Sequence, residues 1–252
     1  MSRDGSQYSV IAPYYDRFCG ADPEKWARYY EKLLLRHGVK PGALLLDLAC
    51  GTGAVTAALS RRGFDMTGVD ISAEMLAVAR ETAAAAGQDI LLLQQDMTAF
   101  ELYGTVDAAV CTLDSLNYLK NTAALDKCFA LLHNYVIPGG IVAFDLNTRY
   151  KFARLYGDNA YVFEDADATL VWQNHFDRRR RRCDFYLSLF EEQEDGAYLR
   201  YDETQREYLY TDREIKAAAK RAGFEFLSSY GELSFKATRK NSPRIHYVLK
   251  RI

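Results

Sequence analysis

The sequence predicts an α/β protein with a doubly wound, mostly parallel seven-stranded sheet and a small antiparallel β insertion after the fifth strand. Two observations carry this prediction. Short apolar runs alternate with helix-like segments over the first 148 residues, which is the pattern of repeated βαβ units. Over residues 149–210 apolar and polar positions alternate singly instead, which is typical of antiparallel strands.

Five apolar runs mark the parallel strands, and polar or acidic residues follow each of them. The runs cover residues 44–48, 64–70, 90–93, 106–111 and 141–144. Open α/β sheets bind their ligands at the carboxyl ends of the strands. The recurring acids therefore predict a binding site at this edge of the sheet.

Helices are expected before and between these strands. Asp22 as the N-cap and Pro23 at the first position begin an amphipathic helix over 23–36. Asp212 is the expected cap of the last helix. Further helices are predicted over 53–62, 73–86, 121–136 and 212–222, and a closing antiparallel pair of strands near 224–230 and 244–250.

The turn after the first strand, Asp47-Leu48-Ala49-Cys50-Gly51-Thr52-Gly53, is the most informative segment. Glycines here let a ligand approach the backbone and the N-terminus of the next helix. A dinucleotide site would have a third glycine where this chain has Thr56, and the carboxylate of Asp47 would repel phosphates. The expected ligand is a positively charged nucleoside, a description that S-adenosylmethionine fits through its ammonium and sulfonium.

These motifs resemble those of the class I S-adenosylmethionine-dependent methyltransferases. The matching segments are residues 47–53, 68–72, 95–97, 113–117 and 138–140. Tyr14-Tyr15-Asp16-Arg17-Phe18 and Trp26 look like the N-terminal cap of the bacterial small-molecule branch, which includes amino-sugar N,N-dimethyltransferases. The resemblance implies a Rossmann-like domain built from residues 1–148 and 211–252, with residues 149–210 as an inserted acceptor-binding lobe.

Most candidate cofactor residues lie in the turns at the strand ends. We expect Asp47 to orient the ammonium of the cofactor. Asp70 follows at close to the ~20-residue offset at which a βαβ unit places a ribose-binding carboxylate. Asp96 would accept a hydrogen bond from the adenine amine, and Met97 would cover the ring. The full predicted set is Tyr14, Tyr15, Trp26, Asp47, Ala49, Gly51, Gly53, Asp70, Ile71, Met75, Asp96, Met97, Leu113, Asp114 and Ser115.

Tyr14, Asp114 and His175 are the candidates for catalysis. A tyrosine ring attracts cations, Asp114 lies in the expected floor beneath the sulfonium, and His175 is the candidate general base. Methyl transfer to give S-adenosylhomocysteine requires alignment rather than a metal. A hydroxyl acceptor must lose a proton before attack, whereas a neutral amine need not. Because no His–Asp pairing is evident, we expect a nitrogen acceptor.

The composition of the chain limits the classes of partner that the protein is expected to bind. A net charge of −2 gives no general attraction for nucleic acid or anionic lipid. The polar N-terminus and the absence of a long apolar run predict a cytoplasmic protein without a membrane segment. The five cysteines lack paired spacing, so free thiols are expected rather than bridges or a metal site. A small-molecule acceptor and a monomer or homodimer are the resulting expectations.

Alternative functions remain open at this point. The arginine run 178–182 suggests either a solvated hairpin tip or a phosphate contact, so methylation of tRNA or rRNA is one alternative and methylation of a protein is another. The acidic residues indicate that S-adenosylmethionine binds, but they do not indicate that its methyl group is transferred. A non-catalytic S-adenosylmethionine-binding module is therefore a further alternative. Asp47 and Thr56 disfavour a nicotinamide dehydrogenase.

Overall fold

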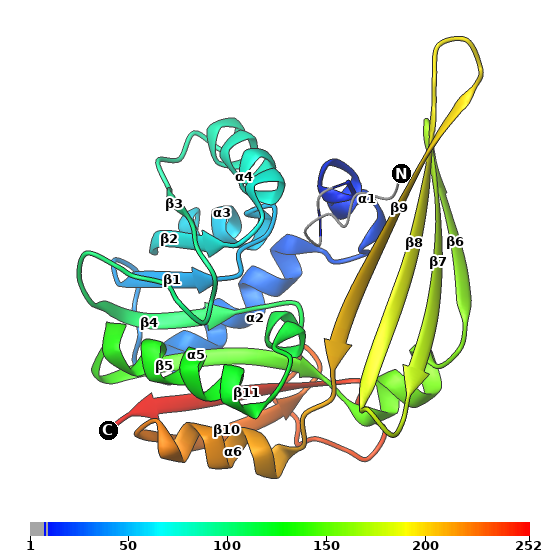
Figure 1. Ribbon diagram of the computed structural model, residues 1–252. Coiled ribbons are helices and arrows are strands. Elements are labelled where there is room, and N and C mark those ends of the chain that lie inside the picture. Colours follow the sequence, from blue (N-terminus) through cyan, green and yellow to red (C-terminus); the bar gives the residue numbers. More distant parts are fainter. Residues whose placement is uncertain (1–7, 9) are drawn as a thin grey trace.

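The computed structural model describes residues 8 and 10–252. Its centre is a seven-stranded sheet in the order β10-β11-β5-β4-β1-β2-β3, in which only β11 runs against the others (Figure 1). The predicted doubly wound sheet is thus confirmed. The strands are β1 (Leu44–Leu48), β2 (Asp65–Asp70), β3 (Leu91–Gln94), β4 (Val106–Cys111), β5 (Val136–Asn147), β10 (Phe224–Gly231) and β11 (Arg244–Arg251).

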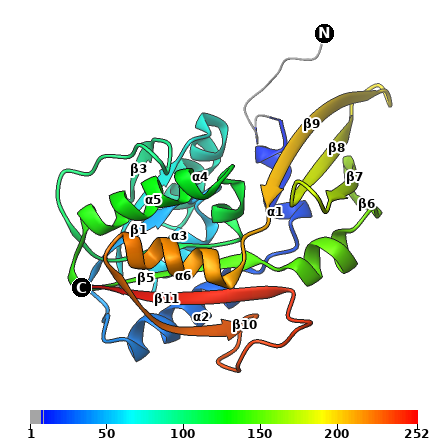
Figure 2. The ribbon, with the colours of Figure 1, turned by 60° about the horizontal axis from the view of Figure 1, so that its bottom comes forward.

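Helices cover both faces of the sheet. One apolar core joins the sheet to α2 and α3, and a second core joins its other face to α5 and α6 (Figure 2). Helix α4 lies near β2 and β3. The helices of this layer are α2 (Pro23–Arg36), α3 (Ala54–Ser60), α4 (Ala73–Ala85), α5 (Thr122–Tyr135) and α6 (Asp212–Arg221).

Helix starts follow local side-chain chemistry. The Asp22 carboxylate accepts from the Lys25 N–H at 3.1 Å, as the sequence predicts, and the Ser72 hydroxyl accepts from the Met75 N–H at 3.1 Å. The expected cap of α6 is wrong. Thr211, not Asp212, is the N-cap, and it forms a reciprocal capping box with Glu214. Both side chains then satisfy N–H groups that the helix leaves free.

The capping box predicts a difference between two neighbouring substitutions. Thr211→Ala is expected to lower the free energy of unfolding by about 1 kcal/mol, because the cap hydroxyl is lost. Asp212→Ala removes an exposed ion pair to Lys216 and should lower it by no more than about 0.5 kcal/mol. Urea unfolding of both variants measures the difference. A larger loss for Asp212→Ala would restore Asp212 as the cap.

A second sheet of four antiparallel strands follows β5 and stands beside the main sheet (Figure 1). We call it the β-lobe. It is reached through the short π-helical segment η3 (Lys151–Tyr156), and it returns the chain to α6. Its strands, in the order of the sheet, are β6 (Ala160–Asp165), β7 (Ala168–Asp177), β8 (Arg182–Glu192) and β9 (Tyr198–Tyr208).

The N-terminal segment joins the two sheets. It comprises the short helices η1 (Ala12–Tyr14) and α1 (Tyr15–Phe18), which lie between the main sheet and the β-lobe (Figures 1 and 2). Phe18 packs in the core of the lobe, while Asp16 accepts from the Thr52 hydroxyl at 2.9 Å in the turn after β1. In the part of the chain that the structure describes, no helix is long and apolar enough to cross a bilayer.

Candidate active site

A cavity of about 710 Å³ opens at the carboxyl ends of β1, β2 and β4. β1 and β4 are neighbours although they are not consecutive in the chain, so the cavity lies at the switch point where open α/β sheets bind ligands. The structure brings ten predicted residues to its wall: Tyr15, Ala49, Gly51, Asp70, Ile71, Met75, Asp96, Met97, Leu113 and Ser115.

The turn after β1 is held open by its backbone and by Asp70. Gly51 has a φ of +55°, a conformation that side chains disfavour, and its N–H donates to one Asp70 carboxylate oxygen at 2.8 Å. Gly53 acts differently. It does not line the cavity, and a Cβ there would lie only 3.0 Å from the Cβ of Ala79. This glycine lets α3 pack closely against α4.

Asp70 is buried at the end of β2 and lines the cavity. One oxygen accepts from Gly51 and the other accepts from the Ser72 N–H at 2.9 Å. Burial raises the pKa of this carboxyl, and the backbone hydrogen bonds oppose the shift. Each oxygen has two acceptor positions and uses one on the backbone. Both oxygens therefore retain capacity for a pair of ligand hydroxyls, such as those of a ribose.

Asp47 lies beneath this turn, fully buried, and is not part of the cavity wall. The hydroxyl of Thr56 donates to one of its oxygens at 2.6 Å, while the other oxygen has no partner among the described residues. Burial raises the pKa of Asp47 to about 7. A buried acceptor without a partner is costly, and a cation near the turn would favour its charged form. The cradle thus fits a nucleoside that carries an ammonium.

Asp96 occupies an exposed turn at the rim of the cavity. One of its oxygens accepts from the backbone N–H and the hydroxyl of Thr98, at 2.7 and 2.8 Å. These bonds fix the orientation of the carboxylate and leave its second oxygen free for a ligand. Met97 is beside it in the cavity wall.

A smaller chamber of about 110 Å³ adjoins the first cavity. Both spaces are lined by Tyr8, Tyr15, Cys19, Leu113 and Tyr118. The hydroxyls of Tyr8 and Tyr118 lie 2.5 Å apart in this shared wall. The remaining walls of the chamber come from the N-terminal segment, Asp114, the β-lobe, η3 and β11. The chamber therefore connects the strand-end site to the inserted sheet.

Asp114 lines this smaller chamber rather than the larger cavity. Leu113 and Asp114 have φ values of +57° and +59°, which L residues rarely adopt. The buried carboxylate of Asp145 holds this strained turn by accepting from the Asp114 N–H at 2.9 Å. Such strain is typical of positions that a binding site requires.

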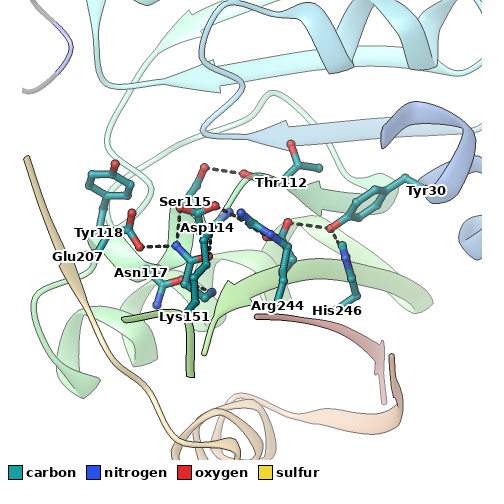
Figure 3. Close-up of polar contacts among 12 residues, drawn as sticks. Tyr30, Thr112, Asp114, Ser115, Asn117, Tyr118, Lys151, Glu207, Arg244 and His246 are labelled. Atoms are coloured by element: carbon teal, nitrogen blue, oxygen red, sulfur yellow. Dashed lines mark hydrogen bonds and ion pairs between the residues drawn. The ribbon is translucent and has the colours of Figure 1, made fainter. Parts of the chain in front are cut away.

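Arg244 neutralises both of these carboxylates, and Figure 3 shows its side chain beside Asp114. Its guanidinium lies 2.5 Å from Asp114 and also pairs with Asp145. Burial alone would raise the pKa of Asp114, but the positive charges of Arg244 and Lys151 hold it below its usual value. Burial raises the pKa of Asp145 despite Arg244.

Glu207 and Lys151 complete the polar lining of the chamber. Asn147 joins these groups. Its amide nitrogen donates to Glu207 at 2.7 Å and to Asp114 at 2.8 Å, and its amide oxygen accepts from the Lys151 amine at 2.8 Å. The sequence interpretation missed all of these residues. A signal was present in β9, where Gln205 and Glu207 are polar at positions that face the interior.

Besides Asp47 and Gly53, three further predicted residues lie outside both spaces. Tyr14 donates its hydroxyl to Glu191 of the β-lobe at 2.5 Å. Trp26 is buried in the α2 core, where its ring faces the Arg244 guanidinium at 5.1 Å. His175 is exposed on β7 and pairs with Asp158 at 3.0 Å. The structure therefore does not bring Tyr14 or His175 to the cavity for catalysis.

The arginine run forms the turn between β7 and β8 and the start of β8. Arg178, Arg179 and Arg180 are exposed at this tip. Arg181 pairs with Glu214 at 2.6 Å and Arg182 with Asp184 at 2.7 Å. Arg180 also lies 3.6 Å from Asp177, so three of the five charges are paired within the protein, as expected for a hairpin tip.

Comparison with known proteins yields a consistent set of similarities. Residues 45–140 match a family described as Methyltransferase domain. The putative methyltransferase YqeM of Bacillus subtilis (strain 168) is 33% identical over 86% of this chain and 86% of its own length. An S-adenosylmethionine-dependent methyltransferase from Clostridium acetobutylicum is 29% identical, with a TM-score of 0.86 over 97% of this chain and 98% of its own.

A third similarity is limited to part of the chain. A dTDP-3-amino-3,6-dideoxy-alpha-D-glucopyranose N,N-dimethyltransferase from Streptomyces fradiae is 34% identical over 49% of this chain and 46% of its own length.

Proposed function

The chain belongs to the S-adenosylmethionine-dependent methyltransferases, and within this family we propose that it methylates a small molecule at an amine nitrogen. When bound, S-adenosylmethionine supplies a methyl group on a positively charged sulfur. The residues placed to hold it are Asp70 for the ribose, Asp96 for the adenine and, from beneath the turn, Asp47 for the ammonium.

One observation carries the choice of acceptor: the chamber that adjoins the cofactor cavity is lined by Asp114, which Arg244 neutralises, and by a second carboxyl group, that of Glu207, near Lys151. A cavity of about 150 Å³ is known to hold benzene, so about 110 Å³ suits a fragment of roughly five non-hydrogen atoms. Asp114 and Glu207 present carboxyl groups to that fragment. An amine, which is positively charged at neutral pH, complements them better than an alcohol does.

The β-lobe supplies the other face of this proposed acceptor site. Trp172, Leu170 and Leu187 line the chamber from β7 and β8. Tyr8 and Tyr118 line both the chamber and the cofactor cavity where the two adjoin. Together they exclude water and align the nitrogen, which is the main task of a protein in methyl transfer. We therefore propose residues 149–210 as the acceptor-binding lobe. We also propose that the protein acts in the cytoplasm, as a monomer or a homodimer.

The similarity to a sugar-amine dimethyltransferase supports a nitrogen acceptor. The net charge of −2 supports a small molecule rather than a nucleic acid as the methyl acceptor. Together these observations support a small amine as the class of acceptor.

A screen with matched acceptors tests this proposal. Each amine is paired with the alcohol of the same skeleton, such as cyclopentylamine with cyclopentanol, and methylated product is measured by mass spectrometry. We expect methylation of several amines and none of their alcohols, because the alcohols require a strong base before attack. Equal or greater turnover of the alcohols, or of RNA, would refute the small-amine assignment.

A further inference from the structure

Glu207 is an unusual residue for the inner face of the β-lobe. It is only 2% exposed, and it lies on β9 among the apolar and aromatic side chains of the smaller chamber. The amide nitrogen of Asn147 donates to its carboxyl group at 2.7 Å and to that of Asp114 at 2.8 Å, so the two carboxyl groups lie close together. Two buried carboxyl groups that share one donor in this way cannot both be ionised at low cost. The pair therefore holds one proton.

The surrounding charges place that proton on Glu207. Burial, then the negative charge of Asp114, raises the pKa of Glu207 well above its usual value, although Lys151 opposes this. Arg244 contacts Asp114 and not Glu207, so it stabilises the charge of Asp114 alone. The ionisable groups that face or lie near Glu207 are Asp114 beside η2, Tyr118 of η2, Lys151 and Tyr156 of η3, Tyr8 of the N-terminal segment, Cys183 of β8 and, through Asp114, Arg244 of β11.

Resting on the proposed function, we propose that Glu207 recognises the acceptor amine as its ammonium ion and then accepts the proton that the amine must lose before methylation. The geometry supports both roles. Glu207 and Asp114 both line the chamber, and the chamber shares a wall with the cofactor cavity. Asn147 keeps one oxygen of Glu207 occupied, and Asp114 remains tied to Arg244.

The proton balance has two steps. When the ammonium enters, Glu207 releases its proton to solvent and forms an ion pair with the ligand. One N–H bond of the ammonium then breaks, its proton forms an O–H bond on Glu207, and the electron pair of that bond stays on nitrogen as the lone pair for attack. Binding of a cation is therefore coupled to the loss of one proton from the protein.

Tetramethylammonium isolates the recognition step. It has five non-hydrogen atoms, it fits the chamber by the size argument above, and it can neither lose a proton nor be methylated. Its affinity for the wild-type protein with S-adenosylhomocysteine is measured by calorimetry at a series of pH values from mildly acidic to mildly alkaline, because the pKa of Glu207 is raised. We expect affinity to rise about tenfold per pH unit until Glu207 is ionised.

The Glu207→Gln variant removes the ionisable group at this position but keeps its hydrogen bonds. Glutamine can still accept from Asn147 and donate to Asp114, as the protonated acid does, but it cannot ionise. We expect its tetramethylammonium binding to be weak and independent of pH, and its kcat/KM for amines to fall about 10²- to 10⁴-fold. Asp202→Asn, an exposed carboxylate of the same strand, should match the wild type.

The outcomes separate this inference from the proposed function. If the wild type methylates no amine, the proposed function fails. If it methylates amines, but Glu207→Gln keeps its rate and pH profile, only the role of Glu207 fails. A flat pH dependence of tetramethylammonium affinity in the wild type also overturns the inference. That last measurement needs no variant, so it decides the question even if Glu207→Gln does not fold.

Discussion

Replacing Asp70 with alanine is expected to weaken S-adenosylmethionine binding by roughly 100-fold or more. Both oxygens of Asp70 already accept one backbone N–H, from Gly51 and Ser72, and so are fixed toward the cavity. Two further hydrogen bonds from ribose hydroxyls to this charged group would each contribute about 1.5 kcal/mol. Their sum of about 3 kcal/mol corresponds to somewhat more than a hundredfold in Kd.

The same substitution should also lower the free energy of unfolding, by about 1–3 kcal/mol for each buried N–H left without a partner. Calorimetric titration below the unfolding temperature separates the two effects. Asp65→Ala, at the exposed opposite end of β2, is the matched control and should bind like the wild type. Wild-type affinity in Asp70→Ala would remove Asp70 from the cofactor site.

The sequence predicted the main sheet well because its signals are local. Ser72 and Asn121 cap helices whose starts fall within one residue of those expected, since each cap bonds an N–H only three residues away. The acids after β1, β2 and β5 were expected at one edge of the sheet, and parallel pairing brings them there. The cap of α6 was misplaced although Thr211 and Glu214 have the capping-box spacing.

The smaller chamber could not be predicted in the same way. Its residues come from segments far apart in the chain, and their meeting depends on how the β-lobe docks on the main sheet. Glu207 reaches Asp114 only because β9 runs beside η2 (Ser115–Tyr118). Tyr14 and His175 show the converse. Both are residue types common in active sites, but the docking of the lobe directs the first to Glu191 and leaves the second exposed.

The buried charges at the end of β5 predict a second large effect. Arg244→Met is expected to lower the free energy of unfolding at neutral pH by about 3–5 kcal/mol, because it leaves two buried carboxylates, Asp114 and Asp145, without their cation. Methionine keeps much of the arginine stem volume, so packing loss is a minor part. Arg200→Met, which breaks an exposed pair with Asp202, should change it by no more than about 1 kcal/mol.

The effect of Arg244→Met should shrink as the pH falls. In the wild type Arg244 and Lys151 hold the folded-state pKa of Asp114 below its unfolded-state pKa. The ionised Asp114 therefore stabilises the folded state at pH values above its unfolded-state pKa. This stabilisation is lost as the pH falls through its folded-state pKa. In the variant the folded pKa of Asp114 rises above the unfolded value, and that of Asp145, which burial already raises in the wild type, rises further. The protonated forms of these two groups then stabilise the folded state fully at pH values below their unfolded-state pKa. This stabilisation is lost as the pH rises through their folded-state pKa.

Between about pH 7 and about pH 5 the change in the variant is the one that narrows the gap, because the loss from Asp114 in the wild type begins only near its unfolded pKa. Urea unfolding at about pH 7 and about pH 5 should therefore give a smaller gap at the lower value. Adding Asp145→Asn to Arg244→Met removes one uncompensated charge and should recover part of the loss at neutral pH. An equal gap at both pH values, with no recovery in the double variant, would show that Arg244 stabilises the fold by packing against Trp26 rather than by neutralising these acids.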